Sequence, residues 1–305
     1  MFLLAIMGLP LAGCAITPAG PVIQKPPNFP TKAHLTSVPF YAQEKYQCGP
    51  AALAMVLQWS GRAVEPGQLV STVYTPARKG SLQSGLVTAA RRHGRLAYPI
   101  KGFNALMSEV AAGRPVIVLQ NLGLKWIPRW HYAVVIGYDL DQRRVVMHSG
   151  ASPSRAVGFR TFTNTWKRAD YWGLLVLPPD QMPRNPELTS YLKSAFGLQI
   201  AGHVGAAIEA FENAAAQWPQ NVEAAIALGN AYYLDGSKQK AMNAFSKAVQ
   251  IAPNNGAALN NLAHLLAESG NLDKAEITAL RAVDAGGPHA EVYRQTLEEI
   301  RAKRR

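Results

Sequence analysis

The sequence contains little cysteine, with only Cys14 and Cys48 among 305 residues. Two cysteines cannot build the disulfide framework that stabilises many small secreted domains. No group of Cys and His residues has the spacing of zinc ligands. The sequence therefore excludes a disulfide scaffold, and we expect neither a metal ion nor a cofactor.

Charged residues are also scarce, at 16% of the chain against 48% hydrophobic residues, which is typical of globular domains. The length predicts about two domains. Residues 1–180 hold 19 Lys and Arg against 7 Asp and Glu, a difference of +12, whereas residues 181–305 hold 12 of each. A basic excess can attract an acidic substrate, anionic lipid or nucleic acid. Because no nucleic-acid motif accompanies it, we expect a solvated basic surface on the first domain and no nucleic-acid partner.

The apolar run at residues 1–13 is too short to span a bilayer, which takes ~20 residues, and it predicts a signal peptide. Leu11-Ala12-Gly13-Cys14 resembles the bacterial lipobox, which implies that Cys14 becomes a lipidated N-terminus. No Lys or Arg precedes the run, which leaves open a start further upstream. An ordinary signal peptide and a Cys14–Cys48 disulfide are the alternatives. By resemblance to Gram-negative lipoproteins, Ala15 at the position after the cysteine, where Asp is absent, implies a cell-envelope protein at the outer membrane, facing the periplasm.

Residues 14–36 are rich in proline, which predicts an extended tether between the anchor and the first domain.

The chain is organised around Cys48, which precedes Gly49-Pro50 and the apolar run 51–57. Proline suits the first position of a helix, so we expect Cys48 at a helix N-terminus, where the N–H groups and the dipole favour a thiolate. Gln43 could present its amide to a developing oxyanion. A buried structural cysteine is the alternative. His131, within Trp130-His131-Tyr132, supplies a candidate base for thiol chemistry.

Gln43, the segment 48–55 and the segment 131–139 resemble the papain-like peptidases that cut double-glycine leaders from bacteriocins. Within that group, these segments are more similar to stand-alone bacterial relatives, which are lipoproteins with a repeat domain C-terminal to the peptidase domain. The resemblance covers roughly residues 38–177. It implies an α+β papain-like cysteine peptidase domain at residues 37–180, with Cys48 and His131 as catalytic residues.

The hydrophobic patterns agree with an order of helices followed by an antiparallel sheet. Beyond the Cys48 helix, they predict helices at 81–93 and 103–112 and strands at 115–119, 132–138, 143–147 and 172–177. The segment 126–130 contains two tryptophans around Pro128. It could wall a cleft for an extended peptide or pack its loop against the core.

A third catalytic residue is less evident from the sequence. If Tyr138 pairs with Arg143, Ala133 lies opposite His148, and His148 can orient the ring of His131. The related peptidases have an Asp at about this point. The carboxylates of Asp139, Asp141 and Asp170 are the alternatives to His148, although Asp139 and Asp141 are typical turn residues.

An internal repeat of 34 residues follows the first domain. It links Gly202, Gly236 and Gly270, and likewise Ala207, Ala241 and Ala275. The period resembles the tetratricopeptide repeat and predicts an all-α domain at residues 186–305, with copies at roughly 187–220, 221–254 and 255–288 and a capping helix at 291–303. Such arrays usually bind a peptide or protein partner.

Two functions of different class follow. The first is a membrane-anchored cysteine peptidase that cleaves a peptide or protein recruited by the repeats. The second is a catalytically weak or inactive papain-like scaffold that binds peptides or partner proteins. Intact Gln43, Cys48 and His131 favour the first, and the absence of the expected Asp favours the second.

Overall fold

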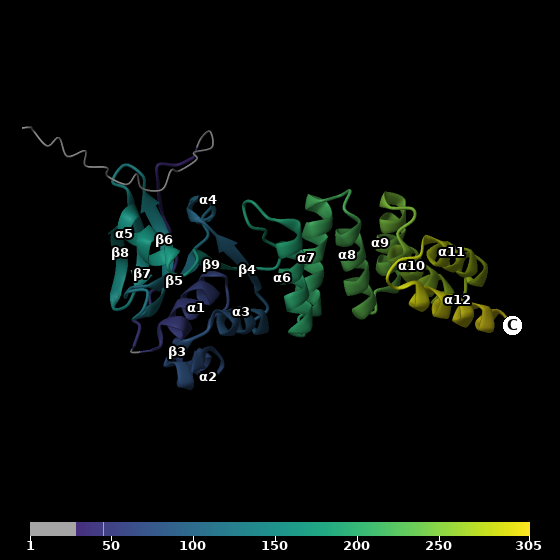
Figure 1. The fold of residues 1–305 in the computed structure, drawn as a ribbon, viewed down its shortest axis with the longest axis horizontal. Helices are drawn as coiled ribbons and strands as arrows, with labels where there is room; N and C mark the ends of the chain where they lie inside the picture. The colour runs from purple at the N-terminus through teal and green to yellow at the C-terminus, as the bar shows by residue number, and fades with distance from the viewer. Residues whose placement is uncertain (1–28, 45) are drawn as a thin grey trace, which may run out of the picture.

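The computed structural model describes residues 29–44 and 46–305, and it consists of a sheet domain followed by a row of helices (Figure 1). The expected signal peptide, Cys14 and most of the expected tether lie outside the described residues. The strands are β1 Lys32–His34, β2 Tyr74–Thr75, β3 Gly80–Ser81, β4 Leu96–Lys101, β5 Val116–Asn121, β6 Trp130–Asp139, β7 Arg144–Ser149, β8 Ser152–Gly158 and β9 Trp172–Leu177. The helices of this domain are α1 Cys48–Trp59, α2 Pro66–Val73, α3 Gln83–Arg92, α4 Phe103–Ala111 and α5 Phe159–Lys167, with a 3₁₀ turn at Pro76–Arg78.

The main sheet is antiparallel, in the order β4-β9-β5-β6-β7-β8, and β1 adds to β6. Lys32–His34 pair with Gly137–Asp139, and the N–H of Leu35 donates to the carbonyl of Ile136 at 2.7 Å. The prediction of a tether through residue 36 is therefore wrong for residues 32–34, which belong to the sheet.

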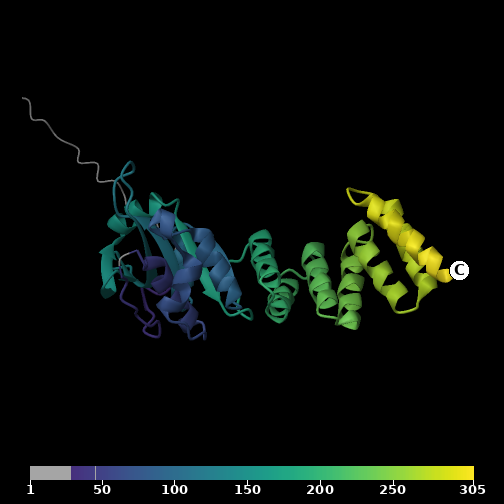
Figure 2. The same cartoon turned by 90° about the horizontal axis from the view of Figure 1, so that it is seen from below.

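Helices cover both faces of this sheet. Along β6, Tyr132, Val134 and Ile136 pack in one core with α1, α2 and α3, whereas Ala133 and Val135 pack in another with α4 and α5. This alternation is the two-residue period of a strand that is buried on both faces. Figure 2 shows the helices of residues 48–92, in purple to blue, lying across one face of the sheet.

The predicted helices and strands of the sheet domain all form, with ends shifted by a few residues. Seven helices and strands of the described part of this domain were not predicted, namely β1, α2, β2, β3, β4, β8 and α5. The order of helices first and sheet afterwards holds only in part, because β4 precedes α4 and α5 interrupts the sheet strands. The α+β class is confirmed.

The helices that follow the sheet domain are α6 Leu188–Ile200, α7 Val204–Gln217, α8 Val222–Leu234, α9 Lys238–Ile251, α10 Gly256–Glu268, α11 Leu272–Ala285 and α12 Ala290–Arg304. Gly202, Gly236 and Gly270 follow α6, α8 and α10 with φ of 86°, 80° and 82°, the left-handed region where glycine ends a helix. Ala207, Ala241 and Ala275 are fully buried. The 34-residue period therefore reflects three helical pairs.

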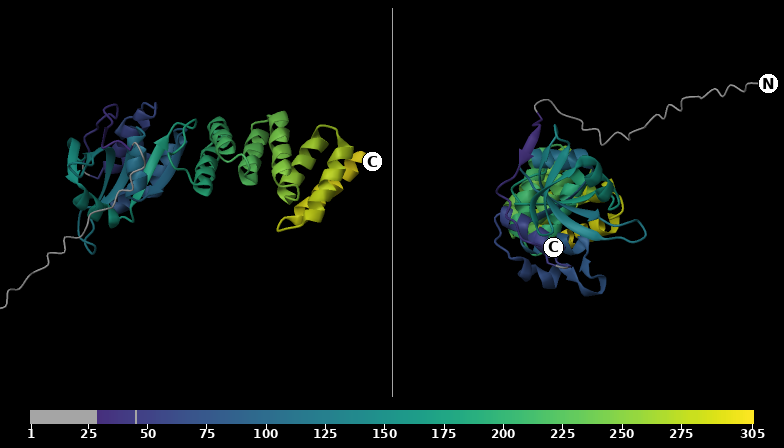
Figure 3. Two further views of the ribbon diagram at one scale, coloured as in Figure 1. Left: turned by 90° about the horizontal axis from the view of Figure 1, so that it is seen from above. Right: turned by 90° about the vertical axis from the view of Figure 1, so that its left-hand side faces the viewer.

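The first helix of the row also belongs to the core of the sheet domain. Tyr191, Ala195 and Leu198 of α6 share a buried cluster with Leu96 and Tyr98 of β4. From there the row extends away from the sheet, as the view from above on the left of Figure 3 shows. The shared core fixes where the row begins relative to the sheet domain.

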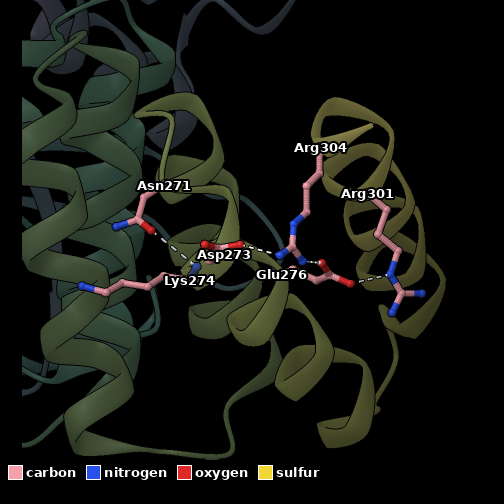
Figure 4. A network of polar contacts seen from close by, with 6 residues as sticks. All are labelled: Asn271, Asp273, Lys274, Glu276, Arg301 and Arg304. Atoms are coloured by element: carbon pink, nitrogen blue, oxygen red, sulfur yellow. Dashed lines mark hydrogen bonds and ion pairs between the residues drawn. The ribbon is translucent and has the colours of Figure 1, made fainter.

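The far end of the row is closed by α12. Arg301 and Arg304 of this helix bond Glu276 of α11, and Arg304 also bonds Asp273 at 2.6 Å (Figure 4). The charged outer face of α12 is that of a terminal capping helix. Among the described residues, no helix is apolar over a length sufficient to cross a bilayer.

Candidate active site

Cys48 is the first residue of α1, a helix buried from Gly49 to Leu57. The backbone N–H groups of Tyr132, Gly49 and Cys48 itself lie near enough to the thiol to act on its pKa. Burial raises the pKa of the thiol, and this effect outweighs the three N–H groups, which lower it. The expected helix-terminal position is present, but the free protein favours the thiol over the predicted thiolate.

His131 lies near the start of β6, one residue before Tyr132, whose N–H lowers the pKa of Cys48. Burial lowers the pKa of His131 to about 4, with a smaller contribution from the positive charge of Arg155. The imidazole is therefore neutral at pH 7, which is the form that can accept a proton. Cys48 and His131 line the same cavity.

Ser149, at the end of β7, makes the contact that orients His131. Its Oγ lies 2.9 Å from Nε2 of His131. If Nε2 carries the hydrogen and donates to Ser149, Nδ1 is left as the ring nitrogen able to take a proton from Cys48. The sequence interpretation missed Ser149.

His148 does not contact His131, so the predicted orienting contact is wrong. Nε2 of His148 lies 3.2 Å from the carbonyl oxygen of Val38, and Nδ1 accepts from the N–H of Ser154 at 3.2 Å. The ring of Phe40 packs against it at 5.3 Å. His148 thus binds together segments on the other face of the sheet.

The pairing of β6 with β7 differs from the predicted register for two reasons. The last pair before the β6–β7 turn is Asp139 with Arg144, and not Tyr138 with Arg143. A bulge at Ile136 then shifts the pairing, so that Val134 lies opposite His148. The net shift is one residue, and a shift of one residue exchanges the faces of a strand.

Gln43 is clamped beside the two residues by its backbone and its side chain. Its N–H donates to the carbonyl of Gly150 at 3.0 Å, and its Oε1 accepts from the N–H of Gly150 at 3.0 Å. Nε2 donates to the carbonyl of Tyr132 at 3.1 Å. An amide nitrogen has two hydrogens. One is used by Tyr132, and the second can be offered to a ligand in the cavity.

The alternative carboxylates do not contact His131. Asp139 and Asp141 lie at the β6–β7 turn, where Lys32 is 3.1 and 4.0 Å away. Asp170 lines the cavity but pairs with Lys101 at 2.7 Å. Among the described residues, the partner of His131 is a hydroxyl group.

The cavity has a volume of about 1300 Å³ and opens beside Cys48. Trp130 lines it and is 54% exposed, whereas Trp126 is 76% exposed and does not line it. The expectation that this segment walls a cleft therefore holds for Trp130 only. Trp126 neither lines the cleft nor packs into the core.

Comparisons with known proteins agree with this division of the chain. Residues 35–173 match the Peptidase_C39 like family, and residues 201–256 and 235–297 match two tetratricopeptide repeat families. No curated protein matches the sequence.

Three solved structures illustrate the likeness of each part. A protein from Bacillus anthracis described as a C39-like peptidase has 20% identity and a TM-score of 0.41, covering 48% of this chain and 97% of its own. The type III secretion chaperone SycD of Yersinia enterocolitica, in complex with a peptide of YopD, has 18% identity and a TM-score of 0.36, covering 39% and 95%. The Sgt2 TPR domain of Aspergillus fumigatus has 20% identity and a TM-score of 0.36, covering 39% and 80%. The chain carries a Peptidase_C39-like domain followed by a domain of tetratricopeptide repeats.

Proposed function

We propose that this protein is a cysteine peptidase in which Cys48 attacks a peptide or protein substrate and His131 acts as the general base. The observation that carries the proposal is the joint arrangement of the two residues. The side chains of Cys48 and His131 line one cavity, and the N–H of Tyr132, next to His131, lowers the pKa of the Cys48 thiol. A thiol with a neutral imidazole beside it is the minimum set for acyl transfer.

The pair starts uncharged in this mechanism. The raised pKa of Cys48 and the lowered pKa of His131 both disfavour a preformed thiolate–imidazolium pair. The proton therefore passes from sulfur to His131 as the sulfur attacks the carbonyl carbon. The second N–H of Gln43 can stabilise the oxyanion, and His131 then protonates the leaving amine. Water hydrolyses the acyl-enzyme.

Ser149 holds the ring of His131 in this scheme through the 2.9 Å contact at Nε2. A hydroxyl group orients the ring but brings no negative charge to stabilise an imidazolium, as a carboxylate does. The same observation favours the second candidate, a weakly active or inactive scaffold that binds peptides. We place the peptidase first because the nucleophile, base and amide donor are all present around one cavity.

We further propose that the repeats recruit the substrate or a partner protein, and that Cys14 carries a lipid that holds the protein at the outer membrane, facing the periplasm. The anchor rests on Leu11-Ala12-Gly13-Cys14 alone. Cys14→Ser should leave the protein unprocessed or soluble in cell fractionation. Equal membrane association of both forms would remove the anchor from the account.

The test of the peptidase compares wild type with Cys48→Ala on a mixture of peptides, with products identified by mass spectrometry. Removing a catalytic nucleophile costs about 10⁶-fold in turnover, so we expect no products from the variant. Circular dichroism serves to check that the variant folds. Products that persist in Cys48→Ala, or that are absent with the wild type, would leave the scaffold as the function.

A further inference from the structure

Positive charge borders the cleft around Cys48 and His131. Five cationic and two acidic residues line it: Arg78, Lys79, Lys101, Arg129 and Arg168, and Glu44 and Asp170. Asp170 pairs with Lys101 at 2.7 Å, and Glu44 accepts from the amide of Gln47. Within the described part of the chain, the other four cations have no ion-pair partner, so their charges are not neutralised by carboxylates of the protein.

The first wall is the β2–β3 hairpin, which carries Arg78 and Lys79. It packs against the residues that directly follow Cys48 and His131 in the sequence. A side chain at Gly49, next to Cys48, would collide with the side chain of Ser81, so glycine lets the hairpin pack there. The hydroxyl of Tyr132, next to His131, donates to the carbonyl of Ser81 at 3.2 Å. Arg78 and Lys79 are therefore within three residues of Ser81 in the sequence, and Ser81 packs against Gly49 and Tyr132, the neighbours of Cys48 and His131.

The second wall is the β5–β6 loop, which leads into His131. Arg168 donates to the carbonyls of Gly123 at 2.7 Å and Asn121 at 3.3 Å. The side-chain oxygen of Asn121 accepts from the N–H of Arg129 at 2.9 Å. Because Arg168 bonds only carbonyls, its full charge remains beside the cleft, and Arg129 is held two residues before His131.

Apolar side chains lie among these charges. Leu82, directly after the hairpin strand, is 49% exposed, and Trp130 is 54% exposed, and both line the cleft. A large apolar side chain that stays exposed in a concave site offers area to a bound ligand. The walls therefore combine uncompensated cations with apolar surface.

We propose that the cleft selects extended acidic peptide segments, with Asp or Glu side chains on either side of a bulky apolar residue. Like charges on the walls of a concave site focus their field and draw in ligands of opposite charge. The repeat domain, with charges in balance, supplies no such bias. The inference specifies the substrate class of the proposed peptidase, but the binding preference itself does not require cleavage.

The test measures peptide binding to the full chain carrying Cys48→Ala, so that nothing is cleaved. Labelled peptides of one sequence have their charged positions filled by all Glu, all Gln or all Lys around a central Leu. Fluorescence anisotropy gives each dissociation constant at low and at physiological salt. We expect the Glu peptide to bind most tightly, with a preference that salt weakens.

Removing charges from one wall of the cleft then tests whether that wall causes the preference for the Glu peptide. Arg78→Gln with Lys79→Gln should weaken binding of the Glu peptide about tenfold and leave the Gln peptide unchanged. Arg160→Gln with Lys167→Gln removes the same charge from exposed positions of α5 outside the cleft and serves as the matched control. Equal affinity for the Glu and Gln peptides, or equal loss in the control, would overturn the proposal.

A lipid surface is the other acidic ligand that these cations could face, and vesicles containing phosphatidylglycerol test for it. If the hairpin variant loses vesicle binding and retains the Glu peptide, the proposal is wrong. Cleavage by the protein with Cys48 intact is assayed separately. Selective binding of the Glu peptide without cleavage would support the charge preference and contradict the peptidase. Cleavage without a charge preference would support the peptidase and contradict the charge preference.

Discussion

The two domains of this protein differ in the regularity of their backbones. In the repeat domain, residues with positive φ are glycines, and they recur where helices end. In the sheet domain, non-glycine residues also adopt positive φ, and three of them, Tyr46, Lys79 and Asp170, line the cleft. Such conformations cost free energy and are found often at functional sites. The comparison indicates that one domain is a regular frame and the other holds the cleft with its irregular backbone.

The cores of the two domains also differ in the side chains that lie at their closest contacts. The repeat helices approach closely through alanine and glycine, as where Gly229 of α8 meets the ring of Phe245 of α9. Both domains bury aromatic side chains, but in the sheet domain one of them, Tyr132, directly follows His131. We therefore expect substitutions near Tyr132 to change the rate of reaction, and substitutions in the repeats to change stability or recruitment.

The largest effect should come from the base. His131→Ala removes the proton acceptor and should lower kcat/KM about 10²–10⁴-fold in a peptide-cleavage assay. His148→Ala is the matched control, because this histidine joins Val38 and Ser154 and does not contact His131. It should reduce stability with little change in rate. An equal loss of rate in both variants would restore His148 to the catalytic set.

Within the repeats, Gly229→Ala should lower the free energy of unfolding by about 1–3 kcal/mol, because an added Cβ would lie 2.5 Å from the ring of Phe245. Gly205→Ala is the matched control, since its Cβ would meet no atom within 4 Å. It should be neutral or stabilising. Denaturant unfolding measures both. If Gly229→Ala also slows cleavage of a short peptide, the two domains are not separable as described.

Ser149→Ala should lower kcat about tenfold, because the ring of His131 loses one orienting hydrogen bond worth about 1–1.5 kcal/mol. Ser149→Asp should retain or raise kcat, since a carboxylate also stabilises the imidazolium. Steady-state kinetics of the two variants decide the point. If both variants are as active as wild type, Ser149 has no role in orienting the base.

The smallest effect concerns pH. The base must be neutral, and the pKa of His131 is lowered to about 4 by burial and then by Arg155. kcat/KM should therefore stay level as the pH falls through 6.5 and decline only near pH 4. Arg155→Gln removes a positive charge and should move this decline to a slightly higher pH. A decline near pH 6.5 in the wild type would contradict the burial of His131.

The sequence predicted regular features better than irregular ones. The 34-residue spacing of Gly202, Gly236 and Gly270 indicated the repeats because each glycine marks the same helix end. The position of Cys48 at a helix start followed from Pro50. The period-two pattern of β6 was also sufficient to predict that strand.

The elements that were missed lack a strong pattern. β4 contains Pro99, which an edge strand tolerates, and β8 is an exposed edge strand with Pro153. α5 is rich in Thr and aromatic residues, which favour helices little, and it forms because Phe159, Phe162 and Trp166 are buried. The bulge at Ile136 left no signal in the sequence, so Ser149 could not be distinguished from His148.

The most direct test of the account is covalent trapping of Cys48. A peptide carrying an electrophilic carbonyl analogue that reacts with catalytic thiols is added to wild type, Cys48→Ala and His131→Ala, and adducts are followed by mass spectrometry with mapping of the modified residue. The account predicts an adduct on Cys48 in the wild type, none in Cys48→Ala, and formation slower by about 10² or more in His131→Ala. Equal rates in wild type and His131→Ala would show that His131 does not activate Cys48, and would contradict the central claim.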